Sequence, residues 1–124
     1  MTVLPRPNTP THELPGASFT SLATPAMGSV DTSVWEVRLS PEHPPTPHRL
    51  TRQEVFVVVS GMGIATLDAV EHPIGAGDAL VAPADTLFSI RASGDGDLVA
   101  ICCFPVGGQA AFEGGDPFTP PWAL

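Results

Sequence analysis

Glycine and proline interrupt this chain so often that no long helix can form in it. The sequence has 12 Gly and 15 Pro in 124 residues, and its proline content is well above average. Between these breakers lie short segments rich in β-branched and aromatic residues, and none keeps a helical period. Strand-like segments recur about every 8–12 residues with turn signals between them, which favours an all-β sandwich or barrel.

Seven segments are predicted to be strands: 18–23, 32–40, 54–60, 64–69, 79–82, 87–92 and 98–104. The segment 32–40 (TSVWEVRLS) alternates apolar and polar residues, as a half-buried strand does. The segment 54–60 (EVFVVVS) is continuously apolar from Val55 to Val59, which predicts a strand buried on both faces. The segment 41–48 contains four prolines and is predicted to be a loop.

The length predicts one domain that spans residues 1–124. Within it, residues 1–17 are rich in Pro and Thr and predict an extended N-terminal arm. The regular segments fall within 32–105, the predicted barrel core. Residues 106–124 form a loop-like C-terminal tail, whose late aromatic residues are expected to pack back onto the body.

Charge and the chain ends limit the partners and the location. The net charge is −8 and there are only five basic residues, so neither nucleic acid nor an anionic membrane is an expected partner. The N-terminus lacks the apolar stretch of a secretory signal, and no apolar run approaches the ~20 residues of a membrane span. Cys102 and Cys103 are adjacent, so in a strand they point to opposite faces and cannot bond each other well. We expect a reduced, cytoplasmic protein.

Two blocks of the sequence resemble the conserved motifs of the cupin superfamily. The block HRLTRQEVFVVVSGMG is similar to the first motif, which reads H-x-H, a short spacer, Glu, six residues and Gly, and His48, Glu54 and Gly61 match it. In the second block, GAGDALVAPADTLFSIRA, the Gly-Asp turn at 77–78 and Pro83 match the second motif. The resemblance covers roughly residues 32–105. It implies a small antiparallel β-barrel of the jelly-roll (double-stranded β-helix) type, and a dimer, which cupins often form.

The departures from the motifs bear on the metal that many cupins hold. Leu50 stands at the second histidine position, Phe88 at the histidine of the second motif, and Ala92 where Asn is usual. Of four ligand positions, only His48 and Glu54 remain, whereas catalytic metal sites commonly supply three protein ligands. We therefore predict no cofactor. A divalent metal held by His48 and Glu54 stays as an alternative, with Glu42 or His43 of the proline-rich loop as further donors.

Residue parity gives an independent prediction of the interior face. Positions 48, 50, 54, 56 and 58 are all even, so on pleated strands they share one face, and in a cupin that face points into the barrel. The residues predicted to line a ligand cavity are Leu50, Phe56, Val58, Phe88 and Ile90. His48 and Glu54 are the candidate catalytic residues. A carboxyl group on such an apolar wall would have a raised pKa, and the pair could act as general acid and base.

Three functions are compatible with these residues. The first hypothesis is a protein that binds a small organic molecule in an apolar cavity, with metal-independent isomerisation, cyclisation or dehydration as its chemistry. The second is a metal-dependent oxygenase or isomerase that uses His48 and Glu54. The third is a sensor or accessory protein without chemistry.

Structural roles compete with these hypotheses. Glu54 could instead pair with Arg38, Arg52 or Arg91, and Leu50 and Phe88 could close the interior. The outward-facing valines of 54–60 would need cover from a second sheet or a partner subunit. This predicts a homodimer, with the N-terminal arm as a segment for exchange.

Overall fold

Strands make up nearly all the regular structure, and the chain has no α-helix. The computed structural model describes residues 1–124. The strands are β1 (His12–Leu14), β2 (Ala17–Ala23), β3 (Thr32–Leu39), β4 (His48–Leu50), β5 (Glu54–Ser60), β6 (Met62–Leu67), β7 (Val70–Gly75), β8 (Ala79–Ala82), β9 (Phe88–Ala92), β10 (Leu98–Pro105) and β11 (Ala110–Phe112). Two short 3-10 helices, η1 (Pro25–Met27) and η2 (Pro121–Ala123), complete the elements. Neither helix has the length and apolarity that a membrane span requires.

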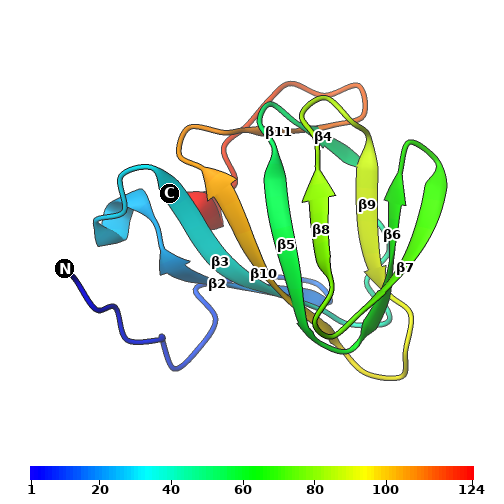
Figure 1. The fold of residues 1–124 in the computed structure, drawn as a ribbon, viewed down its shortest axis with the longest axis horizontal. Helices are drawn as coiled ribbons and strands as arrows, with labels where there is room; N and C mark the ends of the chain where they lie inside the picture. The colour runs from blue at the N-terminus through cyan, green and yellow to red at the C-terminus, as the bar shows by residue number, and fades with distance from the viewer.

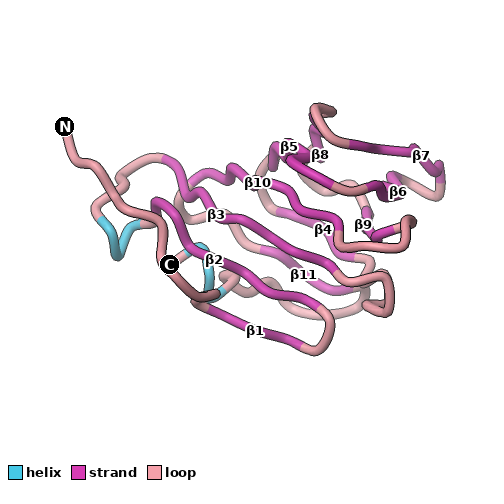
Figure 2. Tube along the Cα trace, turned by 90° about the horizontal axis from the view of Figure 1, so that it is seen from below, coloured by secondary structure: helices cyan, strands magenta, loops and turns pink.

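Two antiparallel sheets form the body of the molecule (Figures 1 and 2). The larger sheet has the order β1-β2-β3-β10-β5-β8, and the smaller has the order β11-β4-β9-β6-β7. Neighbours that are distant in sequence, such as β3 and β10, run side by side over their whole length (Figure 2). The inner faces supply the hydrophobic core, whose largest members are Phe19, Trp35, Phe56, Phe88 and Phe104. The predicted all-β, jelly-roll fold is confirmed.

The predicted strands agree with the observed ones except where strands are short or contain proline. Segments 54–60 and 79–82 coincide with β5 and β8, and the other five overlap observed strands with small shifts at their ends. The sequence analysis did not predict β1, β4, β7 or β11. Of these, β7 contains Pro73 and lies at a sheet edge, where a missing backbone donor costs no ladder bond.

The prediction that β5 is buried on both faces is wrong. On its inner face Glu54, Phe56 and Val58 are buried. On the outer face Val57 and Val59 are 41% and 53% exposed, because no other part of the chain covers these two side chains. The apolar run therefore contains one inward-facing row of buried side chains and one outward-facing row that is partly exposed.

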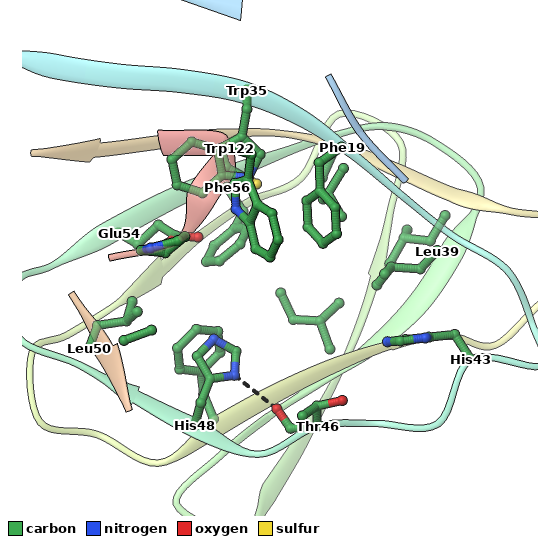
Figure 3. Close-up of a pocket in the computed structure, with 18 of the residues that line it drawn as sticks. Phe19, Trp35, Leu39, His43, Thr46, His48, Leu50, Glu54, Phe56 and Trp122 are labelled. Atoms are coloured by element: carbon green, nitrogen blue, oxygen red, sulfur yellow. Dashed lines mark hydrogen bonds between the residues drawn. The ribbon is translucent and has the colours of Figure 1, made fainter. Parts of the chain in front are cut away.

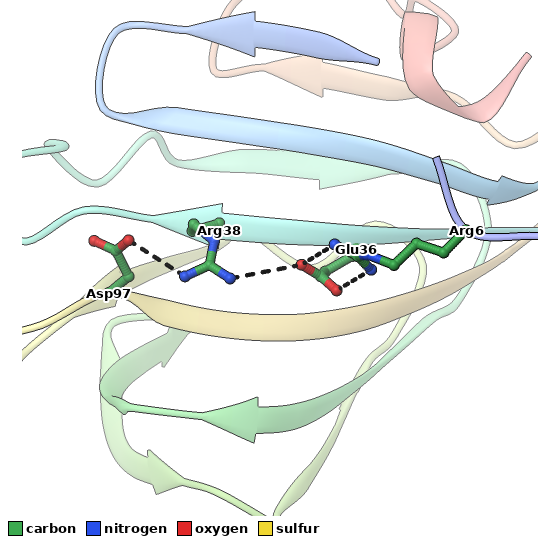
Figure 4. Close-up of polar contacts among 4 residues, drawn as sticks. All are labelled: Arg6, Glu36, Arg38 and Asp97. Atoms are coloured by element: carbon green, nitrogen blue, oxygen red, sulfur yellow. Dashed lines mark hydrogen bonds and ion pairs between the residues drawn. The ribbon is translucent and has the colours of Figure 1, made fainter. Parts of the chain in front are cut away.

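Both ends of the chain are tied to the larger sheet. Near the N-terminus, residues of the predicted arm form β1, which pairs with β2. Arg6 also donates two hydrogen bonds, of 2.6 and 3.1 Å, to the Glu36 carboxylate on the outer face of β3 (Figure 4). The arm therefore pairs within its own chain in this structure.

The C-terminal tail packs back onto the body, as expected from its aromatic residues. The Trp122 indole stacks on Phe19 of β2, with ring centroids 3.6 Å apart and planes 6° apart. Carbonyl oxygens of Trp122 and Ala123 accept hydrogen bonds from the hydroxyls of Ser21 and Ser33, at 2.8 and 2.7 Å. The tail is not loop throughout, because β11 pairs with β4.

Close packing at the turn between β5 and β6 explains the glycines there. Gly61 has φ +86°, a left-handed conformation that glycine adopts without strain. Gly63 does not have a positive φ. A Cβ atom at Gly63 would instead lie 2.6 Å from the carbonyl oxygen of Arg91 and 2.7 Å from a methyl group of Leu98. Gly63 is thus required for the close approach of β6 to its neighbours.

Candidate functional site

A cavity of about 190 Å³ lies between the inner faces of the two sheets. All the residues predicted to face the interior line it: His48, Leu50, Glu54, Phe56, Val58, Phe88 and Ile90. Figure 3 shows His48 and Leu50 on one side of the open space, with Phe19 and Trp35 across from them. These side chains therefore face the interior, as residue parity predicts, and their binding and catalytic roles remain predictions.

Strand register explains how these residues meet. Glu54, Phe56 and Val58 alternate along β5 with the outward-facing valines, so the three share its inner face. On the opposite sheet, His48 of β4 is the cross-strand partner of Phe88 of β9. Packing one sheet on the other brings the two groups to the same cavity.

Glu54 is the most unusual residue of the site. Its side chain borders the cavity, the residue is only 5% exposed, and its carboxyl group has no hydrogen bond or ion pair within the chain. Burial, which disfavours the charged form, raises the pKa of Glu54 to about 8. This carboxyl group is therefore protonated at neutral pH and is free to interact with a bound molecule.

None of the arginines considered as partners of Glu54 reaches it. Arg38 approaches Glu36 and Asp97, at 4.0 and 3.5 Å (Figure 4). Arg91 lies 3.7 Å from Glu71, and Arg52 makes no ion pair. A simple structural salt bridge is therefore not the reason that Glu54 occupies the interior.

His48 is held as a neutral imidazole with one nitrogen available. Its Nδ1 atom lies 2.8 Å from the carbonyl oxygen of Thr46. Because a carbonyl oxygen can only accept, Nδ1 carries the proton and Nε2 is left as an acceptor. Burial lowers the pKa of His48, and the hydrogen bond to Thr46 opposes this shift only in part. His48 and Glu54 form no ion pair with each other.

Leu50 and Phe88 do not close the interior, although each is only 2% exposed. Both border the cavity, as predicted, and the alternative in which they complete a solid core does not hold. The reason is geometric. The barrel is wide enough that one layer of side chains from each sheet leaves a space at the centre.

The donor set does not fit the catalytic metal site that the cupin motifs imply. No group of three His, Cys, Asp or Glu side chains is close enough to hold a metal ion. At the motif positions only His48 and Glu54 are donors, and the hydrocarbon side chains of Leu50 and Phe88 occupy the other two. We therefore derive no chemistry through a metal.

Several lining residues were not predicted from the sequence. Trp35 and Leu39 come from β3, where strand alternation could have identified them. Phe19 comes from β2, and Trp122 comes from the tail, which carries no periodic signal. Cys102 also lines the cavity, and burial raises the pKa of its thiol well above the usual value, so it is an unreactive apolar wall residue. Its neighbour Cys103 is on the other face, as predicted, and both are free thiols.

His43 is the most informative of the residues that the sequence analysis did not place in the cavity. It lies in the proline-rich loop between β3 and β4, and its ring borders the cavity (Figure 3). Its Nδ1 atom lies 2.9 Å from the carbonyl oxygen of Pro15, so Nδ1 is the donor and Nε2 is unpaired. A Cβ atom at Gly16 would lie 3.1 Å from the Cβ of His43, which shows how closely the loop packs here.

Solved structures with the same fold include proteins of different functions. The chain is similar to KdgF from Halomonas sp., with a TM-score of 0.72 and 23% identity over 85% of this chain and 93% of that one. It is also similar to a cupin-like protein from Thermotoga maritima, with a TM-score of 0.71 and 22% identity over 80% and 77% of the two chains. At these identities the likeness supports the fold alone.

Sequence comparison gives a closer but shorter match. The chain is 47% identical over 45 residues to the dimethylsulfoniopropionate lyase DddW of Ruegeria pomeroyi. The match covers 36% of this chain and 30% of that relative. Residues 35–104, more than half of the chain, match the family described as the cupin domain. This chain is therefore a member of the cupin domain family.

Proposed function

We propose that the protein binds a small organic molecule, mainly apolar and with at least one polar group, in the cavity between the sheets. The observation that carries the proposal is Glu54, a residue only 5% exposed, whose carboxyl group opens onto the cavity and has no partner in the chain. A buried polar group without a partner costs free energy. A ligand that supplies the missing interaction would offset this cost, while the apolar walls fix the rest of the molecule.

The cavity can be tested by filling it. The Ala100 side chain is buried at the cavity wall, and Ala100→Leu would place a larger side chain in the space. A panel of small alcohols, ketones, lactones and carboxylic acids would be screened by thermal shift against the wild type and this variant. A true ligand raises the melting temperature of the wild type and not that of a folded Ala100→Leu variant. Equal responses of the two proteins to every compound would refute binding in the cavity.

We also propose proton-transfer catalysis, isomerisation, cyclisation or dehydration, as a second function of the same site. Its support is the pairing of a protonated Glu54, which can donate, with a neutral His48 whose Nε2 can accept. The two groups border one cavity without bonding each other, so both are available to a bound molecule. The curated relative is named as a lyase, and elimination reactions of that class also need a base to remove a proton.

Deuterium exchange would test the catalytic proposal directly. A ligand found in the thermal-shift screen would be incubated with the protein in D₂O, and its C–H signals followed by NMR. Enzyme-dependent loss of one signal, abolished in both Glu54→Gln and His48→Gln, is the expected result. A ligand that binds but exchanges no proton would leave the protein as a binding module or sensor.

We further propose that a second copy of the chain covers the exposed valines of the larger sheet. Val57 and Val59 on β5 share the outer face of the sheet with Val81 on β8, whose cross-strand partner is Val55, and β8 is the edge strand of that sheet. An apolar row next to an unpaired edge suits a symmetric contact between two copies. Light scattering should give a dimer mass for the wild type and a monomer mass for Val57→Lys with Val81→Lys. Val30→Lys, at an exposed loop position, is the control.

A further inference from the structure

Aromatic side chains are concentrated around the cavity. The chain has six Phe, two Trp and no Tyr. Every one of them except Phe104 lines the cavity: Phe19, Trp35, Phe56, Phe88, Phe112, Phe118 and Trp122. They come from both sheets and from the C-terminal tail, so aromatic rings lie on several sides of the space (Figure 3). Aromatic faces carry negative electrostatic potential and attract organic cations.

The charges around the cavity are of one sign. Among the lining residues Glu54 is the only acid, and no arginine is among them. The chain has no lysine, because its five basic residues are Arg6, Arg38, Arg49, Arg52 and Arg91. His43 and His48 both border the space, and each places Nδ1 against a backbone carbonyl oxygen, so each presents an acceptor nitrogen. The cavity thus offers aromatic rings, acceptors and one acid, but no positive charge.

A cationic ligand would complete this arrangement. Glu54 has no counter-charge in the chain, and a positive group beside it would favour loss of its proton, so that the ionised carboxylate pairs with the cation. Phe56 shares the inner face of β5 with Glu54, two residues away, so a group that reaches the carboxyl oxygens also lies near that ring. A strongly hydrated ammonium ion would lose too much hydration in such apolar walls. A cation whose charge is covered by methyl groups would lose less.

We propose that the cavity recognises a small organic onium group, such as a quaternary ammonium or sulfonium, with its charge between Glu54 and the aromatic side chains. The inference rests on the proposed binding function and adds the chemical class of the ligand. It makes Glu54 and Phe56 the residues that determine specificity for charge. His43 and His48 would then accept hydrogen bonds from a hydroxyl group elsewhere on the ligand.

Choline and 3,3-dimethylbutan-1-ol are the probes for this proposal. They have the same skeleton, and a neutral carbon in the alcohol replaces the charged nitrogen. Trp35 and Trp122 both line the cavity, so their indole N–H signals report binding in an NMR titration, even at millimolar affinity. We expect choline to bind the wild type at least about tenfold more tightly than the alcohol, since a desolvated cation–aromatic contact is of that order.

Variants assign the preference to the proposed residues. Glu54→Gln should bring the affinities for choline and the alcohol within about twofold of each other, because the counter-charge is gone. Phe56→Leu keeps an apolar side chain but removes the ring. It should lower the affinity for choline about two- to fivefold and change the affinity for the alcohol little. Phe104→Leu, at the one aromatic ring that does not line the cavity, is the matched control and should leave the preference unchanged.

The outcomes separate this proposal from the proposed function. Equal affinity of the wild type for the two probes would overturn the onium class and leave the apolar binding cavity intact. Binding of the alcohol alone would have the same meaning. If neither probe binds, the onium class is again overturned, and the panel tested against Ala100→Leu then decides whether the cavity binds any small molecule.

Discussion

The rings of His48 on β4 and Phe88 on β9 are in contact, with their centroids 4.3 Å apart and their planes tilted by 51°. In the cupin motifs that this chain resembles, both positions hold histidines that share one metal ion. Here a phenyl ring replaces the second imidazole and covers the first. The substitution removes a metal donor and adds an apolar contact to the partly buried imidazole, and burial favours its neutral form.

This contact predicts how stability depends on pH on the acid side. Burial lowers the pKa of His48 below 6.5, so under mild acid the unfolded chain binds a proton that the folded chain does not. Stability associated with His48 is therefore full above pH 6.5 and is lost as the pH falls through the lower, folded-state pKa. Between pH 7 and pH 5, the free energy of unfolding measured in urea should fall less for His48→Gln than for the wild type. Equal losses would mean that His48 titrates normally.

Glu54 predicts the opposite trend at higher pH. Its folded-state pKa of about 8 lies above the ordinary value of 4.5, so the folded chain keeps a proton that the unfolded chain releases. Between these two values the wild type should lose up to about 1.4 kcal/mol of stability per pH unit relative to Glu54→Gln. Urea unfolding from pH 5 to pH 8 would measure the free energy of unfolding of each protein. The other carboxyl groups are the same in both, so their contribution drops out of the difference. Parallel curves would contradict the raised pKa.

Gly63 predicts a stability effect without any charge. In Gly63→Ala the new Cβ would meet the Arg91 carbonyl oxygen at 2.6 Å, and a backbone atom cannot move aside cheaply. We expect a loss of about 1–3 kcal/mol, the usual range for an overpacked core. Gly94→Ala is the matched control, since its Cβ would lie 3.7 Å from the nearest atom. The expectation fails if thermal unfolding gives the two variants the same melting temperature.

The fold and one wall of the site could be predicted from the sequence for identifiable physical reasons. Continuous β-branched segments such as 54–60 form strands with little dependence on their surroundings, and strand parity is strict enough to place His48, Glu54 and Phe56 on one face. The motif spacing added how β4 and β5 are arranged relative to β9. These signals are local or follow a short period, which is why a single sequence is enough to reveal them.

The rest of the site depends on contacts that no local pattern encodes. Trp122 reaches the cavity only because the tail crosses the larger sheet and stacks on Phe19. His43 is directed into the space by the carbonyl oxygen of Pro15, a residue far away in sequence. Val57 is likewise exposed because no other segment covers it, and its residue type does not reveal this. Tertiary packing decides each of these features.

The stacked pair of Trp122 and Phe19 gives the final prediction, which concerns the C-terminal tail. Trp122→Ala removes an indole that lies flat on Phe19 and also forms part of the cavity wall. We expect the free energy of unfolding to fall by about 2–4 kcal/mol. This is slightly less than the usual cost of removing a fully buried aromatic side chain, because Trp122 is only partly buried. Phe112→Ala, with its half-exposed ring, is the control and should cost clearly less. Urea unfolding with unchanged slopes would measure both free energies of unfolding. Equal losses would show that the stack of Trp122 on Phe19 stabilises the fold no more than a half-exposed ring does.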